Sequence, residues 1–292
     1  MDFFEKFPHR ILIGDGDITT TLRNSPLPTH LGFPHLSITH PDAVLHAHST
    51  AINAGALLIK SNSRNANALS LKDFGTERRV SEINWTAAQL AQNAARQAGV
   101  EMVGSVGPLP ISTEDALRLG IDPLAIFTEQ IGALIDGGAR AILLDSFSDL
   151  PQLLLAVEAK HTLHHCPVIA TLNCSASGQM PDGSLIADAF TQLQAADVDL
   201  LGINAPITPS DLVNLFQILS PQNPSAAFIH LPSLPDPTAD LHDPATLESL
   251  TQAILPLIQS NARWIDGGPG TTTHHLTILA KVIASLPPEN SR

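Results

Sequence analysis

Residues 122–146 read DPLAIFTEQIGALIDGGARAILLDS, and this segment carries the clearest sign of the architecture. Asp122-Pro123 predicts a helix start, because a carboxylate caps free backbone N–H groups and proline fits the first turn. The apolar residues that follow at helical spacing are Leu124, Phe127, Ile131 and Leu134. A Gly-Gly pair at 137–138 ends this helix, and the apolar run Ala139–Leu144 predicts a parallel strand covered on both faces. The segment is therefore one helix–strand unit that ends in a carboxylate, Asp145.

The same kind of unit recurs along the whole chain. The eight apolar runs are Arg10–Gly14, Ala56–Ile59, Val100–Gly104, Ala139–Leu144, Val168–Leu172, Val198–Ile203, Ala226–Ile229 and Arg263–Ile265. Segments long enough for a helix separate them, so the pattern is that of an α/β protein with parallel strands. Eight repeats favour a closed barrel, and no GxGxxG or GxxxxGK[ST] motif supports a nucleotide-binding open sheet. We predict a single (β/α)8 TIM barrel, one domain over residues 1–292.

The charge balance excludes several classes of partner. The chain has 15 basic and 28 acidic residues, a formal charge of −13, which argues against binding to nucleic acid or an anionic membrane. No apolar stretch of about 18 residues could span a bilayer. Cys166 and Cys174 flank the run 168–172, roughly 26 Å of extended chain, whereas a disulfide needs Cα atoms within about 7 Å. We therefore expect free thiols and a cytoplasmic protein.

Polar residues end every predicted strand, at the edge where such barrels place their active sites. They are Asp15, Ser61-Asn62, Ser105, Asp145-Ser146, Asn173-Cys174, Asn204, His230 and Asp266-Gly267-Gly268. Loops begin there and are usually polar, which explains part of the pattern. Asp15 and Asp145 go beyond it, because each directly follows an apolar strand and is expected to be partly desolvated. The two carboxylates could hold an ammonium group between them, or they could cap loops and helices.

A glycine-rich turn, Gly267-Gly268-Pro269-Gly270-Thr271, leads from the last predicted strand into a helix. Such a turn can present backbone N–H groups to an anion, or it can simply require glycine for its shape. His274 and His275 follow on the helix. Adjacent helical side chains point in different directions, so this pair is a poor metal chelate.

Six motifs spread over nearly the whole chain resemble those of one enzyme family. They are Asp15-Gly16 with Thr19-Thr20, Ala54-Gly55-Ala56 with Ser61-Asn62-Ser63, Gly104-Ser105-Val106-Gly107-Pro108, Asp145-Ser146, Gly202-Ile203-Asn204, and the segment from Gly267 to His275. The pattern resembles the homocysteine S-methyltransferases, including the homocysteine-binding barrel of cobalamin-dependent methionine synthase and betaine–homocysteine methyltransferase. The resemblance implies a TIM barrel that binds homocysteine and transfers a methyl group.

The departures from this family concern its metal. The resemblance implies a zinc ion held by three cysteines, one after strand six and two after strand eight, but these positions read Ala205, Gly268 and Pro269. None of these side chains can ligate a metal, so no zinc site and no other cofactor are predicted. A replacement site built from His230, Cys174 and Asp266 is conceivable, although histidines at a barrel rim are more often solvated or hydrogen-bonded.

Two further positions differ from the family. Asp145 stands where the family has glutamate, and Lys60 stands at a position that is usually acidic. A lone lysine there is most often an ion-pair partner of Asp15 or Asp145, but it could also be a charged or nucleophilic group in another reaction. Cys174 is a weaker candidate for a nucleophile, because no base is assigned to it.

The resemblance implies the following site. Asp15 and Asp145 bind the ammonium group of a homocysteine-like amino acid, the Gly16 backbone and Ser61-Asn62 hold its carboxylate, and Asn204 completes the site. The expected reaction is methyl or related group transfer by a zinc-independent route, for which a separate protein could supply the methyl donor. The alternative is a catalytically silent barrel that binds an amino acid or serves as a subunit.

Overall fold

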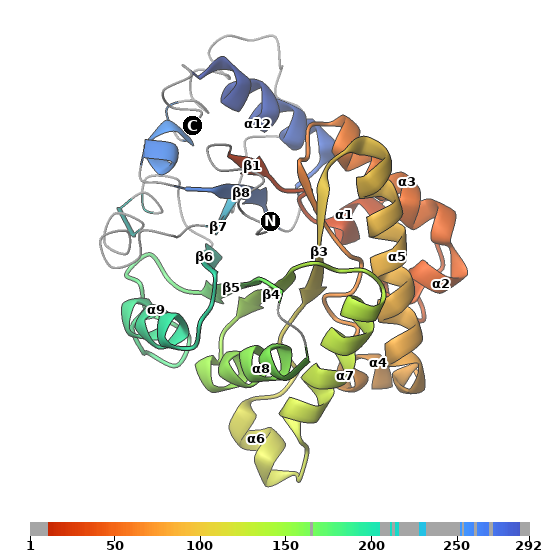
Figure 1. Ribbon diagram of the computed structural model, residues 1–292, viewed down its shortest axis with the longest axis vertical. Helices are drawn as coiled ribbons and strands as arrows, with labels where there is room; N and C mark the ends of the chain where they lie inside the picture. The colour runs from red at the N-terminus through yellow and green to blue at the C-terminus, as the bar shows by residue number, and fades with distance from the viewer. Residues whose placement is uncertain are drawn as a thin grey trace.

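The computed structural model describes residues 11–163, 166–204, 211, 214–215, 228–231, 252, 254–259, 262–268 and 271–286, with the backbone alone at 228–231. Eight strands lie at the centre of the molecule (Figure 1). They are β1 (Leu12–Ile13), β2 (Leu58–Lys60), β3 (Glu101–Val106), β4 (Ile142–Phe147), β5 (Val168–Asn173), β6 (Leu200–Asn204), β7 (Phe228–Leu231) and β8 (Trp264–Gly267). Each strand matches one of the predicted runs. Cys166 and Cys174, on either side of β5, are free thiols, as predicted.

The strands form a parallel sheet in the order β1-β8-β7-β6-β5-β4-β3-β2. Its two ends also meet, because the Leu57 N–H beside β2 donates a hydrogen bond to the Ile13 carbonyl oxygen of β1 at 2.8 Å. The predicted (β/α)8 barrel is therefore confirmed. All strand carboxyl ends lie at one rim of such a barrel.

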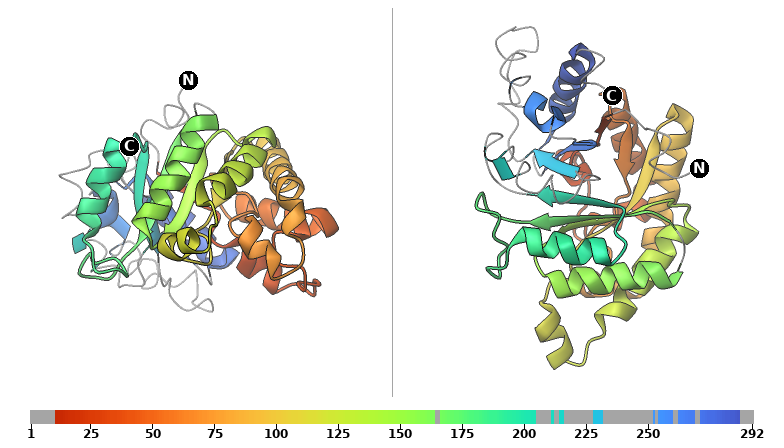
Figure 2. Two further views of the ribbon diagram at one scale, coloured as in Figure 1. Left: turned by 90° about the horizontal axis from the view of Figure 1, so that it is seen from below. Right: turned by 60° about the vertical axis from the view of Figure 1, so that its left-hand side comes forward.

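Helices surround the strands, and Figure 2 shows α8 and α9 running alongside them. The helices are α1 (Ile18–Arg23), α2 (Leu36–Thr39), α3 (Pro41–Asn53), α4 (Ala68–Lys72), α5 (Val80–Ala98), α6 (Thr113–Arg118), α7 (Pro123–Asp136), α8 (Leu150–Leu163), α9 (Ile186–Ala195) and α12 (Thr273–Ser285). In α7 the predicted cap is present, since the Asp122 carboxylate accepts the Ala125 N–H at 3.2 Å. No helix in the described part of the chain is long and apolar enough to cross a membrane.

Alternating strand residues enter two different cores. In β4, Ile142 and Leu144 pack in the large core that the helices cover, whereas Leu143 packs in a smaller cluster with residues of other strands. That cluster fills the barrel interior and contains Leu12, Leu58, Val103, Ala141, Leu143, Ile169, Leu200 and Trp264. Because side chains alternate along a strand, the residue two positions further on points into the barrel as well, closer to the carboxyl-end rim.

Candidate functional site

A polar layer lies directly above the apolar interior of the barrel. In five strands, the residue two positions after the interior apolar residue is polar and buried. These residues are Lys60, Ser105, Asp145, Thr171 and Asp266. The sequence prediction placed most of these side chains at or beyond the ends of the strands. The structure corrects this for Ser105, Asp145 and Asp266, because β3, β4 and β8 extend through them. Lys60 is the last residue of β2, as predicted. Strand pairing therefore fixes the backbone of the polar layer.

A cavity of about 520 Å³ opens above this layer. Five of the six predicted binding residues line it: Gly16, Ser61, Asn62, Asp145 and Asn204. Asp15 is not among the described residues that line the cavity; its carboxylate contacts Lys60, which does line it. The structure thus brings the predicted residues to one place, with Lys60 between Asp15 and the cavity.

Lys60 is held by two buried carboxylates. Its ammonium group lies 2.9 Å from Asp15 and also contacts Asp266, and Asp15 accepts the backbone N–H of Lys60 at 2.9 Å. Asp266 in turn accepts the N–H groups of Gly16 and Gly267, each at 2.8 Å. This cluster joins β1, β2 and β8, and it confirms the interpretation of Lys60 as an ion-pair partner of Asp15.

The electrostatics of this cluster decide the state of the lysine. Burial alone would lower the pKa of Lys60, but Asp15 and Asp266 raise it above its ordinary value. Lys60 is therefore a protonated ammonium group, and a protonated amine is not a nucleophile. Burial and the neighbouring Asp266 raise the pKa of Asp15 to about 6, against the opposing effect of Lys60.

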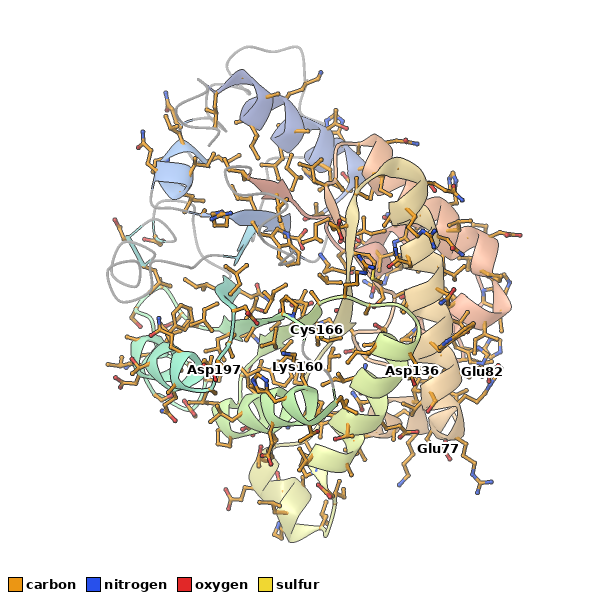
Figure 3. All side chains as sticks on the ribbon, in the orientation of Figure 1. Glu77, Glu82, Asp136, Lys160, Cys166 and Asp197 are labelled. Atoms are coloured by element: carbon orange, nitrogen blue, oxygen red, sulfur yellow. The ribbon has the colours of Figure 1, made fainter. Side chains whose placement is uncertain are left out.

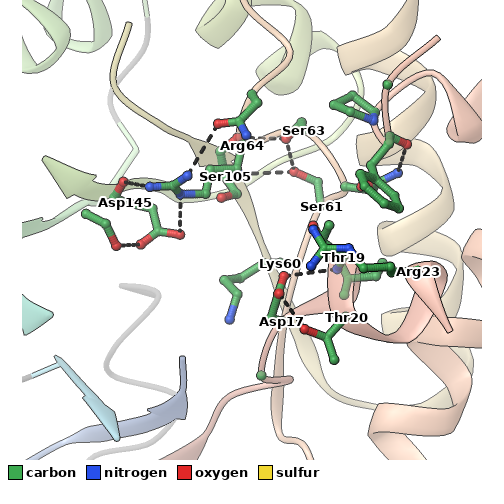
Figure 4. Close-up of a pocket in the computed structure, with 18 of the residues that line it drawn as sticks. Asp17, Thr19, Thr20, Arg23, Lys60, Ser61, Ser63, Arg64, Ser105 and Asp145 are labelled. Atoms are coloured by element: carbon green, nitrogen blue, oxygen red, sulfur yellow. Dashed lines mark hydrogen bonds and ion pairs between the residues drawn. The ribbon is translucent and has the colours of Figure 1, made fainter. Parts of the chain in front are cut away.

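Asp145 has a different cation. The Arg64 Nε lies 3.3 Å from its carboxylate, and an Arg64 terminal nitrogen donates to the Asp145 carbonyl oxygen at 3.3 Å (Figure 4). Ser146 donates to the Asp145 carboxylate at 2.6 Å, and the Asn204 amide donates to the Ser146 hydroxyl at 2.8 Å. The two predicted anchors, Asp15 and Asp145, are therefore each paired with a protein cation of their own.

An irregularity in β4 sets the position of Ser146. The register between β4 and β5 shifts between Leu144 and Phe147, and Ser146 has a φ of +63°, in the left-handed region that non-glycine residues rarely adopt. The Ser146 N–H donates to the Thr171 hydroxyl at 2.6 Å, which fixes this turn of the backbone. Local strain of this kind is frequent at binding sites.

The loop after β2 carries five lining residues, Ser61 to Asn65, and is held by hydrogen bonds to several other segments. The Asn62 amide donates to the Phe33 carbonyl oxygen at 2.9 Å and to the Ser37 hydroxyl at 3.2 Å. The Ser61 hydroxyl lies 2.6 Å from that of Ser63 and accepts the Ser105 N–H at 3.0 Å. The predicted ligand groups of Ser61 and Asn62 therefore already bind protein atoms.

Sequence reasoning did not single out Arg23 and Arg64. Both line the cavity, and the Arg23 guanidinium lies 5.4 Å from the centre of the Phe33 ring. Neither arginine belongs to a motif. The signal that could have found them is that basic residues are rare in this chain. Arg23, Lys60 and Arg64 are three of its 15 basic residues, and all three line one cavity.

The residues at this rim do not fit a three-cysteine zinc site. Gly268 lines the cavity, while Ala205 and Pro269 lie outside the described residues, and none of the three has a ligand atom. Burial raises the pKa of Cys174 to about 12, so this residue is a thiol rather than a thiolate ligand or nucleophile. Cys166 lies at the amino-terminal side of β5, near Lys160 of α8 (Figure 3).

Nor do the other suggested ligands form a site in the described part of the chain, which contains no group of three His, Cys, Asp or Glu side chains placed to hold a metal. Asp266 is bound to Lys60, and the His230 side chain lies outside the described residues. His275 accepts the Thr272 N–H at 3.0 Å and so belongs to the cap of α12, while the predicted turn before it is only partly described.

Residues 12–283 match the family described as homocysteine S-methyltransferase. The methionine synthase of Mycobacterium tuberculosis is 27% identical over 98% of this chain, and that of Mycobacterium leprae is 26% identical over 97%. The chain spans only 26% and 25% of the lengths of these two relatives.

The fold has a solved counterpart. The metallated form of the homocysteine methyltransferase MmuM from Escherichia coli has a TM-score of 0.74 and 20% identity, with 93% of this chain and 96% of that chain covered. At this identity the likeness shows the fold alone, a TIM barrel. The family assignment comes from the sequence match, which extends from β1 to α12. The chain therefore belongs to the homocysteine S-methyltransferase family.

Proposed function

We propose that this chain binds a homocysteine-like amino acid in the cavity at the carboxyl-end rim and transfers a methyl or related group to its sulfur without zinc. The observation that carries the proposal is the position of the predicted residues, because Gly16, Ser61, Asn62, Asp145 and Asn204 line one cavity. Family membership supports methyl transfer to a homocysteine-like acceptor. The chemistry of positions 205, 268 and 269 supports the absence of the family's metal.

The proposed binding mode follows from charge. Asp145 is 5% exposed and borders the cavity. Asp17 also lines the cavity, but its carboxylate caps helix α1 by accepting the Thr19 N–H and the Thr20 hydroxyl, so we assign the substrate ammonium group to Asp145. Asp15 acts through Lys60, which it holds in place. The head-group carboxylate is placed at the side of the cavity lined by Gly16 and Ser61, although the Gly16 N–H and the Ser61 hydroxyl already have protein partners. Asn204 orients Ser146, and through it Asp145.

The transfer step needs a thiolate. The substrate sulfur attacks the methyl carbon of a cationic donor, the donor's carbon–heteroatom bond breaks, and the thiol proton leaves to solvent. A free thiol has a pKa of about 8.5, so only a few per cent is ionised at neutral pH. Lys60 already carries two carboxylate partners and Arg64 pairs with Asp145, so neither is an uncompensated charge that would lower the pKa of the substrate thiol. The proposed reaction is consequently slow at pH 7 and faster in alkali.

One observation favours a second candidate, the catalytically silent amino-acid binder. The side chains at positions 205, 268 and 269 have lost every metal-binding atom, while the described cavity residues remain bonded to one another. A binding protein needs the cavity but not the metal. This candidate predicts the same amino-acid binding without turnover.

Turnover separates the two candidates. EDTA-treated protein is incubated with S-methylmethionine and homocysteine, and methionine is measured by mass spectrometry. The reaction yields two molecules of methionine and a proton. The proposal predicts methionine above the uncatalysed rate and its loss in Asp145→Asn. An exposed variant such as Asp136→Asn of α7 serves as the control and keeps full turnover. A rate equal to the uncatalysed one with this donor and with methyl-cobalamin and methyl-folate donors favours the silent binder.

A further inference from the structure

The cavity contains an ion pair whose two members both face it. Arg64 has 40% of its side chain exposed and Asp145 has 5%, and both line the cavity. Their nitrogen–oxygen contacts of 3.3 Å are longer than the 2.7–2.9 Å of a tight charge-assisted hydrogen bond. The pair is thus close enough to neutralise its charges but loose enough for a ligand to enter between them.

The backbone of Arg64 is fixed by its neighbours. The Arg64 carbonyl oxygen accepts the Gly107 N–H at 2.7 Å, and a Cβ on Gly107 would lie only 2.8 Å from the Arg64 side chain. The preceding Ser63 donates to the Ser105 carbonyl oxygen at 2.7 Å, and its own carbonyl oxygen accepts the Gln130 amide at 2.8 Å. The guanidinium group can therefore turn while its attachment point stays in place.

Asp145 is fixed by a separate set of bonds. Ser146 donates to its carboxylate at 2.6 Å and Thr171 at 3.4 Å, and all three residues are buried. A carboxylate bound in this way keeps its position when Arg64 moves away. The Arg64–Asp145 pair therefore presents one fixed anion and one adjustable cation to the cavity.

We propose that Arg64 and Asp145 form a clamp for the zwitterionic head group of an α-amino acid, with Asp145 binding the ammonium group and Arg64 the carboxylate. This inference rests on the proposed function and names the residue that recognises the carboxylate. A zwitterion supplies both charges, so each member of the protein pair exchanges one partner for another. An amine without a carboxylate displaces Arg64 from Asp145 and gives it no new partner, and an acid without an amine takes Arg64 away from Asp145 and gives the aspartate no ammonium group in return.

The other cations that line the cavity in the described residues are less suited to this role. Lys60 already contacts two buried carboxylates, Asp15 and Asp266. Arg23 is exposed and lies over the ring of Phe33. Arg64 differs from both because its counter-ion faces the cavity and can pass to a ligand. Its planar fork also suits a carboxylate better than an ammonium point charge does.

The clamp is tested by calorimetry with three ligands that share one tail: L-methionine, 3-(methylthio)propylamine, which lacks the carboxylate, and 4-(methylthio)butanoate, which lacks the amine. Wild type is expected to bind methionine best. Arg64→Gln is expected to weaken methionine binding about 10- to 100-fold, the range of a lost charge-assisted contact. The same variant is expected to bind the amine more tightly than wild type, because the amine no longer has to displace the Arg64 guanidinium from Asp145.

Two further variants complete the experiment. Arg64→Lys retains the charge without the fork and should recover part of the methionine affinity. Arg118→Gln of α6 removes another arginine that pairs with an aspartate, Asp115 at 2.7 Å. Neither residue is among those that line the cavity, so this variant should leave all three affinities unchanged. Thermal melting verifies that each variant is folded.

The outcomes distinguish the clamp from the proposed function. Methionine binding that is equal in wild type and Arg64→Gln overturns the clamp and leaves the proposed function standing. The clamp is also overturned if Arg64→Gln weakens the amine and methionine equally, because that pattern indicates a damaged cavity. If wild type binds none of the three ligands and no homocysteine, the proposed function fails and the clamp fails with it.

Discussion

At the scale of single residues, the function of this barrel depends on which charges face the cavity and which are neutralised below it. Lys60 draws Asp15 and Asp266 together, and the three form a buried cluster with one net negative charge. Asp145 and Arg64 form the pair that borders the cavity. In the described part of the site, protein side chains therefore supply the cations that pair with these carboxylates.

Removal of Lys60 is expected to be costly for the fold. Lys60→Met leaves two buried carboxylates without their cation, and breaking a buried ion pair in this way costs about 3–5 kcal/mol. Urea unfolding at pH 7 measures the loss in the free energy of unfolding. The exposed Lys72→Met of α4 is the matched control and should change it by less than about 0.5 kcal/mol. Equal urea midpoints for Lys60→Met and wild type would contradict the assignment of the cluster.

The sequence predicted five of the residues that line the cavity, but not their hydrogen-bond and ion-pair partners. The cavity positions of Gly16, Ser61, Asn62, Asp145 and Asn204 followed from the strand ends and the family motifs. The pairing of Arg64 with Asp145 did not, because 81 residues separate them and no motif includes the arginine. Ion pairs of this kind depend on the three-dimensional register of strands, which a pattern of apolar residues does not encode.

At the scale of elements, helix α3 contains a titratable group with no described hydrogen-bond partner. His48 is 1% exposed, and neither of its ring nitrogens has a partner in the structure. Burial lowers the pKa of His48 to about 4 from an ordinary value of 6.5. The folded protein therefore keeps this ring neutral at a pH at which the unfolded chain is already protonated.

Acid should weaken the fold through His48. Between pH 6.5 and pH 4 the unfolded chain binds the additional proton, so the free energy of unfolding falls as the pH falls. At pH 5 this contribution is about 2 kcal/mol relative to pH 7.5. His48→Leu should remove that part of the loss in urea unfolding at the two pH values, whereas the exposed His46→Gln should retain it. Parallel pH profiles for wild type and His48→Leu would refute the prediction.

Strands β1 and β8 meet where a side chain has no room. A Cβ on Gly14 would lie 2.3 Å from the Asp266 carboxylate and 2.7 Å from the Trp264 indole nitrogen. Gly14→Ala should therefore destabilise the protein by about 1–3 kcal/mol or more. At Gly132 of α7 a Cβ would make only ordinary van der Waals contacts, with the Leu163 side chain at 3.8 and 3.9 Å. Gly132→Ala should therefore stabilise the protein by about 0.5–1 kcal/mol. Thermal melting compares the two, and effects of the same sign would contradict this packing.

The strand pattern was the most predictable part of the fold. All eight apolar runs correspond to strands, because parallel strands covered on both faces need continuous apolar residues. The carboxyl ends were predicted too short in β3, β4 and β8, where polar residues such as Ser105 continue the strand. These residues interrupt the apolar pattern because they point into the polar layer. The polar residues that made the strand ends hard to predict are therefore the residues of the candidate site.

At the scale of the whole molecule, the barrel keeps its fold without the metal ligands of its family. Because none of the residues at positions 205, 268 and 269 can bind zinc, metal removal should not change stability. We expect purified protein to hold less than stoichiometric zinc by elemental analysis and to melt at the same temperature with and without EDTA. One zinc per chain together with an EDTA-induced fall in melting temperature would overturn this prediction.

The rate of methyl transfer should follow the ionisation of the acceptor thiol. With no metal to remove the proton, the reactive thiolate increases about tenfold between pH 6.5 and pH 7.5, below the thiol pKa of about 8.5. The rate at saturating homocysteine should rise by the same factor, measured as methionine formed over the uncatalysed background. A rate independent of pH in this interval would show that the bound thiol is already deprotonated.

The most direct test of the account is a calorimetric titration of EDTA-treated protein with homocysteine, in wild type and in Asp145→Asn. The account predicts saturable binding at one site per chain in wild type and at least about tenfold weaker binding in Asp145→Asn. Absence of binding to the metal-free wild type, or equal affinity in the two proteins, would contradict it.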